Sequence, residues 1–531
     1  MNRTMKAKNV TRVVLLLVAI MAASPLWAQA SAKQSSNPQP GTTATQAVPV
    51  PDVSKEAPQQ AEKLKAQLDE IKIPPLPPFN PQQPKRIELP NHMVVFLQED
   101  HELPIIGGTM RIRGGSIYEP AQKTGLAEIY GVVWRTGGTE TRTGDQLDDF
   151  LEARAAKLET SANDDSTVIS FNCLKGDFND VFTAFNELLR QPEFRQDKID
   201  LVKRQLYGLI SRRNDDVDDI ASREAEKLAY GKDNPYTRQE EYATVAAVTR
   251  QDLIDWHDQY VHPANIIFGI YGDFDSAAIE QLIRKTFGDW PAGSRAPEPK
   301  IQFAPVKPGL YFVNKEDVDQ SSIQMVGLGI TRRDPDYYPV VVMNEILGGG
   351  FASRLFVNLR SKLGLAYSVG GGIGSGWDHR GMDDFSAATK SASTKEMIDG
   401  LRRELNDLIT NPPTPVEMKR AKDSILNSFV FNFDSKEKVL AEKMRYEFYG
   451  YPLDFLEQYR SQIEKVTVDD VNRVAKKYIH PEQYPTLVVG NSTQLGNQLT
   501  SLGAVTDIDI TIPPPPGQPA QPGAAEQPSS K

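Results

Sequence analysis

The chain has 531 residues, too many for a single hydrophobic core, so its length predicts two or more domains. Its hydrophobic content of 39% and its charged content of 24% are ordinary for globular protein. The formal net charge of −10 at pH 7 would repel a polyanion, which excludes nucleic acid as an expected partner.

The first 30 residues predict a secretory signal peptide. A basic segment precedes an apolar run from Val13 to Ala23, and the small residues Ala28–Ala30 offer a cleavage site. The apolar run is too short to anchor the chain stably in a membrane, and no cysteine follows it that could carry a lipid. We expect cleavage before Ser31, no membrane insertion of the mature chain, and a periplasmic location, with secretion to the outside as the alternative.

Two flanking segments differ in composition from the rest of the chain. Residues 31–85 are rich in proline, glutamine, serine and alanine, which predicts an extended linker arm. Residues 496–531 end in a proline-rich sequence, which predicts a disordered tail.

An internal repeat organises the chain between these segments. VTRQDLIDWHDQYVHP begins at Val248 and VTVDDVNRVAKKYIHP begins at Val466, and the matching residues keep one constant offset. A match of this length in constant register predicts two homologous domains. We place them at residues 86–290 and 307–495, joined at residues 291–306 by a linker that contains proline and glycine.

Each half combines helical and strand patterns. In the first half, apolar residues recur at helical spacing from Leu147 to Leu158, and an alternating strand around Ile169 contains the only cysteine, Cys173. In the second half, Ser393 begins a predicted capping box before an amphipathic helix. Because helices do not alternate one for one with strands, the pattern favours the α+β class. We expect Cys173 to be a buried strand residue rather than a nucleophile.

The segment GGSIYEPAQKTGLAEIYGVVWRTGGT, from Gly114 to Thr139, follows the pattern of a metallopeptidase active-site helix. It resembles the insulinase/pitrilysin family of zinc metallopeptidases, and the order of the two halves is similar to the family's two-domain branch, which includes mitochondrial processing peptidase. The resemblance covers about residues 86–495. It implies two homologous domains, each a mainly antiparallel sheet packed with helices, that together form half of a clamshell.

The residues that would bind zinc in this family are replaced. Active members carry HxxEH on a helix, where two histidines one turn apart bind zinc and the glutamate acts as general base. The corresponding positions here hold Glu128, Gly131 and Val132, and the later position of the third ligand holds Leu209. One carboxylate beside apolar residues cannot complete a tetrahedral site, so we expect no metal and no catalytic residue in this motif. Elsewhere no HxxxH or HxH pair occurs, and His257 is expected at the surface.

The second half retains a different motif, ILGGGFASRLFVNLRSKLGLAYSVGGG. It resembles the signature of the subunit that lacks zinc in two-domain members. The resemblance implies that Arg360 and Tyr367 reach the zinc site of a partner and that the glycines Gly348, Gly349 and Gly350 help to admit a peptide. The alternative is structural, with Arg360 as a surface ion-pair partner and Tyr367 as a strand-packing residue.

These features predict the non-catalytic subunit of a heteromeric zinc metallopeptidase. The partner would be a homologous subunit that carries HxxEH and the zinc, whereas this chain would hold no cofactor. The substrate would be an unfolded peptide, bound as an added strand along a sheet edge. One alternative is a stand-alone peptide-binding or scaffolding pseudopeptidase without a catalytic partner. A third is an independent hydrolase, but the chain shows no Ser/His/Asp or paired-carboxylate pattern of useful specificity.

Overall fold

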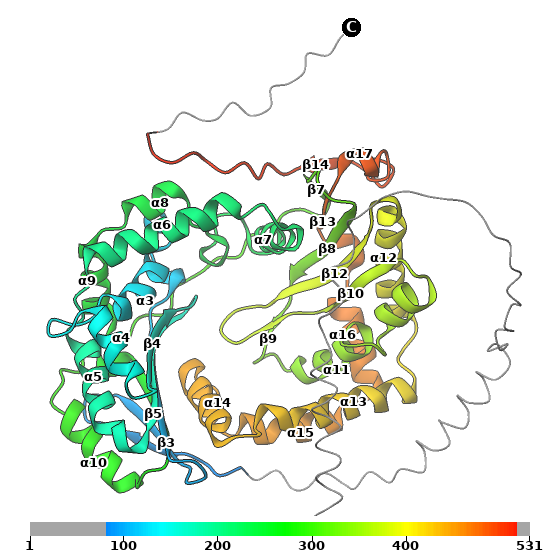
Figure 1. Cartoon of the computed structure of the whole chain (residues 1–531). Coiled ribbons are helices and arrows are strands. Elements are labelled where there is room, and N and C mark those ends of the chain that lie inside the picture. The colour runs from blue at the N-terminus through cyan, green and yellow to red at the C-terminus, as the bar shows by residue number, and fades with distance from the viewer. Residues whose placement is uncertain (1–80, 518–531) are drawn as a thin grey trace, which may run out of the picture. The chain divides into compact units, whose positions relative to one another are not determined.

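The computed structural model describes residues 81–517, and Figure 1 shows their path. The expected signal peptide and nearly all of the proline-rich arm lie outside these residues. None of the described helices combines the length and the apolar composition needed to cross a membrane.

The first half is built on a six-stranded sheet with the strand order β1-β2-β6-β3-β5-β4. Neighbouring strands are antiparallel except for β2 and β6, which are parallel. The strands are β1 (Lys85–Glu88), β2 (Val94–Glu99), β3 (Ile105–Arg113), β4 (Lys157–Ala162), β5 (Ser166–Leu174) and β6 (Ile266–Gly272). The helices are α3 (Leu126–Thr136), α4 (Gly144–Glu152), α5 (Phe178–Arg190), α6 (Gln196–Arg212), α7 (Val217–Tyr230), α8 (Tyr242–Ala247), α9 (Arg250–Tyr260) and α10 (Ser276–Phe287).

The second half has its own six-stranded sheet, with the order β10-β12-β8-β13-β7-β14. The strands are β7 (Leu310–Asn314), β8 (Gln320–Leu328), β10 (Ala366–Gly372), β12 (Met382–Lys390), β13 (Thr486–Gly490) and β14 (Val505–Asp507), and the short strands β9 (Ile330–Thr331) and β11 (Ser375–Gly376) pair separately. The helices are α11 (Tyr337–Leu347), the π-helical segment η6 (Phe356–Lys362), α12 (Thr394–Thr410), α13 (Pro415–Phe429), α14 (Lys436–Tyr449), α15 (Phe455–Lys465), α16 (Val468–Tyr478) and α17 (Ser492–Leu495).

The two sheets repeat the same arrangement over five strands, which confirms the α+β class and the internal repeat. The order β2-β6-β3-β5-β4 in the first sheet corresponds to β7-β13-β8-β12-β10 in the second. In each, the first pair is parallel and the remaining pairs are antiparallel. The repeated VT motif begins equivalent helices, because Thr249 and Thr467 each cap a helix through a capping box.

The sixth strand differs between the halves and corrects the prediction for the C-terminal tail. In the first sheet, β1 precedes β2 and pairs with it antiparallel. In the second, β14 comes from the predicted tail, residues 496–531, and pairs with β7 in parallel. A disordered tail beginning at residue 496 is therefore wrong for the residues up to at least Asp507, because their backbone completes a sheet edge.

Three other local predictions were also wrong. The helical pattern from Leu147 to Leu158 forms a helix only as far as Glu152, and Leu158 lies on β4. Ser393 is the N-cap residue of α12, but its side chain makes no capping hydrogen bond. His257 is buried, with its Nδ1 2.9 Å from the hydroxyl of Tyr130 and its Nε2 3.1 Å from the carbonyl oxygen of Leu189. Burial lowers the pKa of His257 to about 4, so its ring is neutral near pH 7. By contrast, the buried position of Cys173 on β5 is confirmed.

Each half has its own apolar core, and one helix of each half packs against the sheet of the other half. Helix α7 of the first half packs through residues such as Leu228 against Val326 and Leu487 of the second sheet. Helix α14 of the second half packs through Leu440 and other residues against the first sheet (Figure 1). The exchange removes apolar faces of both sheets from water and joins the two halves.

Candidate functional site

A hollow of about 370 Å³ lies beside helix α3, where the family's zinc site would be expected. Glu128 and Val132 line it from α3, and Thr160–Ala162 line it from β4. The turn between β4 and β5 adds Asn163 and Asp164. Because β4 is the last strand of its sheet, the hollow borders a sheet edge.

At Gly131, the position of the family's general base, α3 approaches β4 too closely for any side chain. A Cβ atom there would lie 2.6 Å from the amide nitrogen of Ala162 and 2.9 Å from the carbonyl carbon of Ser161. The hydroxyl of Thr160 also donates a 2.6 Å hydrogen bond to the Gly131 carbonyl oxygen. The strand backbone thus occupies the space in which a glutamate would have to begin.

The remaining positions do not fit a zinc ion. Val132 is 37% exposed on α3 and Leu209 is 63% exposed on α6, and neither side chain has an atom that binds zinc. Glu128 alone could contribute a ligand oxygen. Across residues 81–517, no three His, Cys, Asp or Glu side chains are grouped so that they could hold a metal ion.

Two carboxyl groups of the hollow, Glu119 and Glu128, are instead held in surroundings that favour their protonation. Glu119 is 4% exposed and accepts hydrogen bonds from the backbone amides of Gly125 (3.1 Å) and Ala127 (3.0 Å) at the start of α3. Burial outweighs these bonds and raises the pKa of Glu119 to about 7. Desolvation, with a smaller contribution from the charge of Glu240, raises the pKa of Glu128.

The glycine run predicted to admit a peptide follows helix α11. A Cβ atom at Gly348 would lie 2.3 Å from the carbonyl oxygen of Gly371 on β10, so the loop packs on the edge strand of the second sheet. Gly349 lies against the side chain of Glu345 in the same way, and Gly350 is exposed. The first two positions require glycine for close approach.

Arg360 lies on η6, and its side chain is free to bind another group. It is exposed, and its guanidinium carbon is 4.7 Å from the centre of the Phe356 ring. Among the described residues it has no ion-pair partner and no side-chain hydrogen bond. The structural alternative, a surface ion-pair partner, therefore does not describe Arg360.

Tyr367 lies at an irregularity of the edge strand β10. The register of β10 against β12 shifts between Ala366 and Ser368, so Tyr367 falls outside the regular pairing. Such bulges redirect a side chain. Tyr367 is 49% exposed, and its hydroxyl has no hydrogen-bond partner in the part of the chain that the structure describes. It is not a strand-packing residue.

The predicted residues thus form two separate groups, one beside α3 and one along η6 and β10. Sequence reasoning missed Glu119 and Asp164 beside α3, since neither occupies a ligand position of the zinc motif. It also missed the exposed apolar side chains near Arg360, of which Phe351 is 80% and Leu363 is 52% exposed. For Phe351, its place directly after the glycine run was the available signal.

Comparison with known proteins places both halves in one peptidase family. Residues 94–235 match the family described as insulinase (peptidase family M16), and residues 247–425 match the peptidase M16 inactive domain. A relative from Helicobacter pylori named non-peptidase homolog YmxG is 24% identical over 405 residues, which are 75% of this chain and 91% of the relative. A Bacillus subtilis protein named uncharacterized zinc protease YmxG is 20% identical over 412 residues, 77% of this chain and 98% of that protein.

Solved structures share the fold. The crystal structure of a peptidase M16 inactive domain from Pseudomonas fluorescens aligns with a TM-score of 0.69 at 23% identity, over 77% of this chain and 98% of that one. A crystal structure described as a protease from Helicobacter pylori aligns with a TM-score of 0.65 at 19% identity, over 77% of this chain and all of the other. At these identities the likeness establishes the two-domain fold alone.

Proposed function

The chain belongs to the insulinase family, peptidase family M16, as an inactive homologue, and from this premise we propose that it is the zinc-free subunit of a heteromeric periplasmic metallopeptidase. Its partner would be a homologous subunit with an intact HxxEH motif, which supplies the zinc and the general base. This chain would complete the chamber that holds the peptide.

The observation that carries the proposal is the contrast between the two groups of residues. Beside α3, Gly131 and Val132 offer neither a base nor a ligand, and β4 fills the space that a base would need. Along η6 and β10, Arg360 and Tyr367 are exposed and have no partner among the described residues. Side chains of this kind, next to a close-packed glycine run, suit contact with a peptide supplied from outside the chain.

The chemistry of these two residues suits a peptide bond under attack. The guanidinium of Arg360 presents a rigid fork of donors that can hold a peptide carbonyl or carboxylate oxygen. The hydroxyl of Tyr367 can donate to the oxyanion that develops on the scissile carbonyl. Neither residue needs to move a proton, so both can act from a subunit that does not bind the metal.

The edges of the sheets support an extended substrate. β4 and β10 are equivalent last strands of the two sheets, and each borders one of the two residue groups. An unfolded peptide can add to such an edge through main-chain hydrogen bonds. We propose that the peptide lies along these edges, within reach of Arg360 and Tyr367.

Purification of the tagged chain from its native host tests the proposal, with zinc measured in the eluate. We expect a co-purified homologue that carries HxxEH, one zinc per complex, and peptide cleavage that a chelator abolishes. In that complex, Tyr367→Phe should lower kcat about 100-fold because an oxyanion donor is lost. Arg360→Ala should lower kcat/KM, whereas Arg204→Ala on α6, which removes an exposed arginine that also has no ion-pair partner among the described residues, should behave as wild type.

Normal turnover by both Arg360→Ala and Tyr367→Phe, with the complex intact, would refute the assigned roles. A chain that purifies without partner and without zinc would support a second candidate, a stand-alone peptide-binding pseudopeptidase. The hollow beside α3 favours that candidate, because it borders the edge of β4 within this chain and needs no second subunit.

A further inference from the structure

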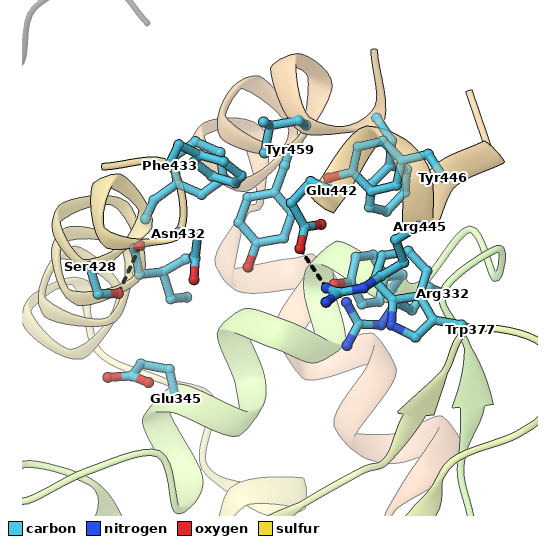
Figure 2. A pocket seen from close by; sticks show the side chains of 15 residues that line it. Arg332, Glu345, Trp377, Ser428, Asn432, Phe433, Glu442, Arg445, Tyr446 and Tyr459 are labelled. Atoms are coloured by element: carbon cyan, nitrogen blue, oxygen red, sulfur yellow. Dashed lines mark hydrogen bonds and ion pairs between the residues drawn. The ribbon is translucent and has the colours of Figure 1, made fainter. Parts of the chain in front are cut away.

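A second hollow, of about 440 Å³, lies entirely within the second half of the chain (Figure 2). Helices α11, α13, α14 and α15 and the segment that follows β11 surround it. It has no lining residue in common with the hollow beside α3, and neither Arg360 nor Tyr367 lines it, although its lining residue Glu345 lies against Gly349 of the glycine run. Its volume lies in the range of sites for small ligands.

One wall carries a positive charge that forms no ion pair with any carboxylate of the described residues. The guanidinium carbon of Arg332 lies 4.1 Å from the centre of the Trp377 ring and 5.8 Å from that of Tyr337. Its Nε donates a 3.3 Å hydrogen bond to the carbonyl oxygen of Ser375. Among residues 81–517 it has no ion-pair partner within 4.0 Å. Its neighbour Arg445, in contrast, is paired with Glu442 at 2.5 Å.

The opposite wall of the hollow carries a negative charge that is likewise unpaired among the described residues. Glu345 lies across the hollow from Arg332 and Arg445 in Figure 2. Its carboxylate has no ion-pair partner within the described part of the chain. The hollow therefore presents one unpaired cation and one unpaired anion on different walls.

An aromatic side chain lies between the two charges. Tyr459 on α15 projects into the hollow, whose lining also includes Arg332 and Glu345. The Tyr459 ring stacks on Phe429, with centroids 5.3 Å apart. Together with Trp377, these rings offer an apolar surface for a side chain of the ligand.

We propose that this hollow binds short peptides with free ends. The terminal carboxylate would pair with Arg332, the terminal ammonium group with Glu345, and an apolar or aromatic side chain would lie against Trp377 or Tyr459. A zwitterion satisfies both unpaired charges at once, whereas a simple anion would meet the repulsion of Glu345 and Glu442. Binding in this hollow would need only this chain and no catalytic partner.

The test is titration of the full mature chain with the dipeptide alanyl-phenylalanine. Binding is measured by calorimetry and by tryptophan fluorescence, because Trp377 lines the hollow. We expect saturable binding at one site. Amidation of the carboxyl end and acetylation of the amino end should each weaken binding about 10-fold or more, because each leaves a charge of the hollow unpaired.

Two variants test which side chain binds which end of the peptide. Arg332→Gln should lower the affinity for the free dipeptide about 10-fold, and amidation of the peptide should then cause no further loss of affinity. Glu345→Gln should in the same way abolish the effect of acetylation. Arg403→Gln, on the exposed face of α12, should bind as wild type.

Three outcomes would overturn the proposal: no binding by the wild-type chain, equal affinity for free and blocked dipeptides, or equal sensitivity to amidation in wild type and Arg332→Gln. Loss of the Arg332 stacking contact with Trp377 could unfold that variant. The blocked dipeptides then still decide the matter, because they require only the wild-type protein.

Discussion

At the residue scale, Gly131 shows that this chain lacks both the side chain of the family's general base and the space for it. Replacement of a general base by glycine would by itself leave an empty space. Here the backbone of β4 fills that space, and Thr160 bonds the glycine carbonyl. Restoration of the motif would therefore require a shift of the strand as well as new side chains.

We predict that Gly131→Ala lowers the free energy of unfolding by about 1–3 kcal/mol, because its Cβ would overlap the backbone of Ala162. Gly208→Ala on α6 is the matched control, since no atom of residues 81–517 lies within 4 Å of a Cβ there. In that variant the free energy of unfolding should rise by about 0.5–1 kcal/mol, because alanine has a higher helix propensity than glycine. Denaturant titration of both variants checks the contrast, and a stable Gly131→Ala would show that β4 is not held against α3.

Glu119 gives a pH prediction. Its pKa in the folded chain is about 7, above its ordinary value of 4.5, so between these values the folded state binds more protons than the unfolded state. The free energy of unfolding should therefore fall as pH rises from about 4.5 to about 7, by up to about 3 kcal/mol from this group, and stay level above.

The difference in unfolding free energy between wild type and Glu119→Gln isolates this trend. His257, whose pKa lies near 4, and Asp383, whose pKa burial raises to about 7, titrate in both proteins and cancel. Denaturant titrations at several pH values from 4.5 to 8 measure the difference. A difference that does not change with pH would contradict the assigned pKa.

At the element scale, the exchange of α7 and α14 joins the two halves. Each helix covers an apolar surface of the sheet to which it does not belong in sequence. On the α14 side, Phe448 also lies under the guanidinium groups of Arg111 and Arg113, at 3.9 and 4.1 Å from the ring centre. Cation–π contacts of this kind add to the apolar burial.

Leu228→Ala on α7 should lower the free energy of unfolding by about 2–5 kcal/mol, because it leaves a cavity between α7 and the second sheet. Leu201→Ala on α6 removes the same atoms from a residue that is 43% exposed, and should change stability by less than about 0.5 kcal/mol. Thermal unfolding compares the two. Equal losses would mean that α7 does not hold the halves together.

At the scale of the whole molecule, residues 505–512 form a C-terminal strap across both halves (Figure 1). β14 pairs with β7, and the amide of Ile508 donates a 2.7 Å hydrogen bond to Phe312. Asn214 of the first half donates a 2.7 Å bond to the carbonyl oxygen of Ile510. Ile512 then packs against the first core.

Deletion of residues 505–531 should lower the free energy of unfolding by about 2 kcal/mol or more, since several partly buried isoleucine contacts are lost. Deletion of residues 518–531 keeps the contacts that the strap makes with residues 81–517 and should have little effect. Hydrogen exchange at α7 should rise in the longer deletion only. Similar exchange in both deletions would show that the strap does not bind the halves.

Several features of this protein follow from its sequence alone. The repeated VT motif encodes its own helix caps, so it predicts two equivalent helices and two homologous halves without any tertiary information. The alternation around Cys173 predicts a buried strand for the same local reason. The loss of the zinc ligands at Glu128 and Val132, and of the general base at Gly131, is a matter of side-chain chemistry that the local sequence already shows.

One error was avoidable. Leu253, Trp256, His257 and Tyr260 lie at the spacing of one helix face, and all four are buried on α9. The periodicity therefore predicts burial of His257, whereas its polarity alone suggested the surface.

The remaining features depend on residues far apart in the chain. The contact of Gly131 with β4, the exchange of α7 and α14, and the strap at 505–512 each join segments that no local pattern relates. The same holds for the hollow between Arg332 and Glu345. Local residue chemistry determined the repeat, the fold class and the lost metal site, because periodicity and ligand identity act over a few residues. Only the tertiary structure decided which charges remain unpaired and which faces are covered, because both depend on what the folded chain brings alongside them.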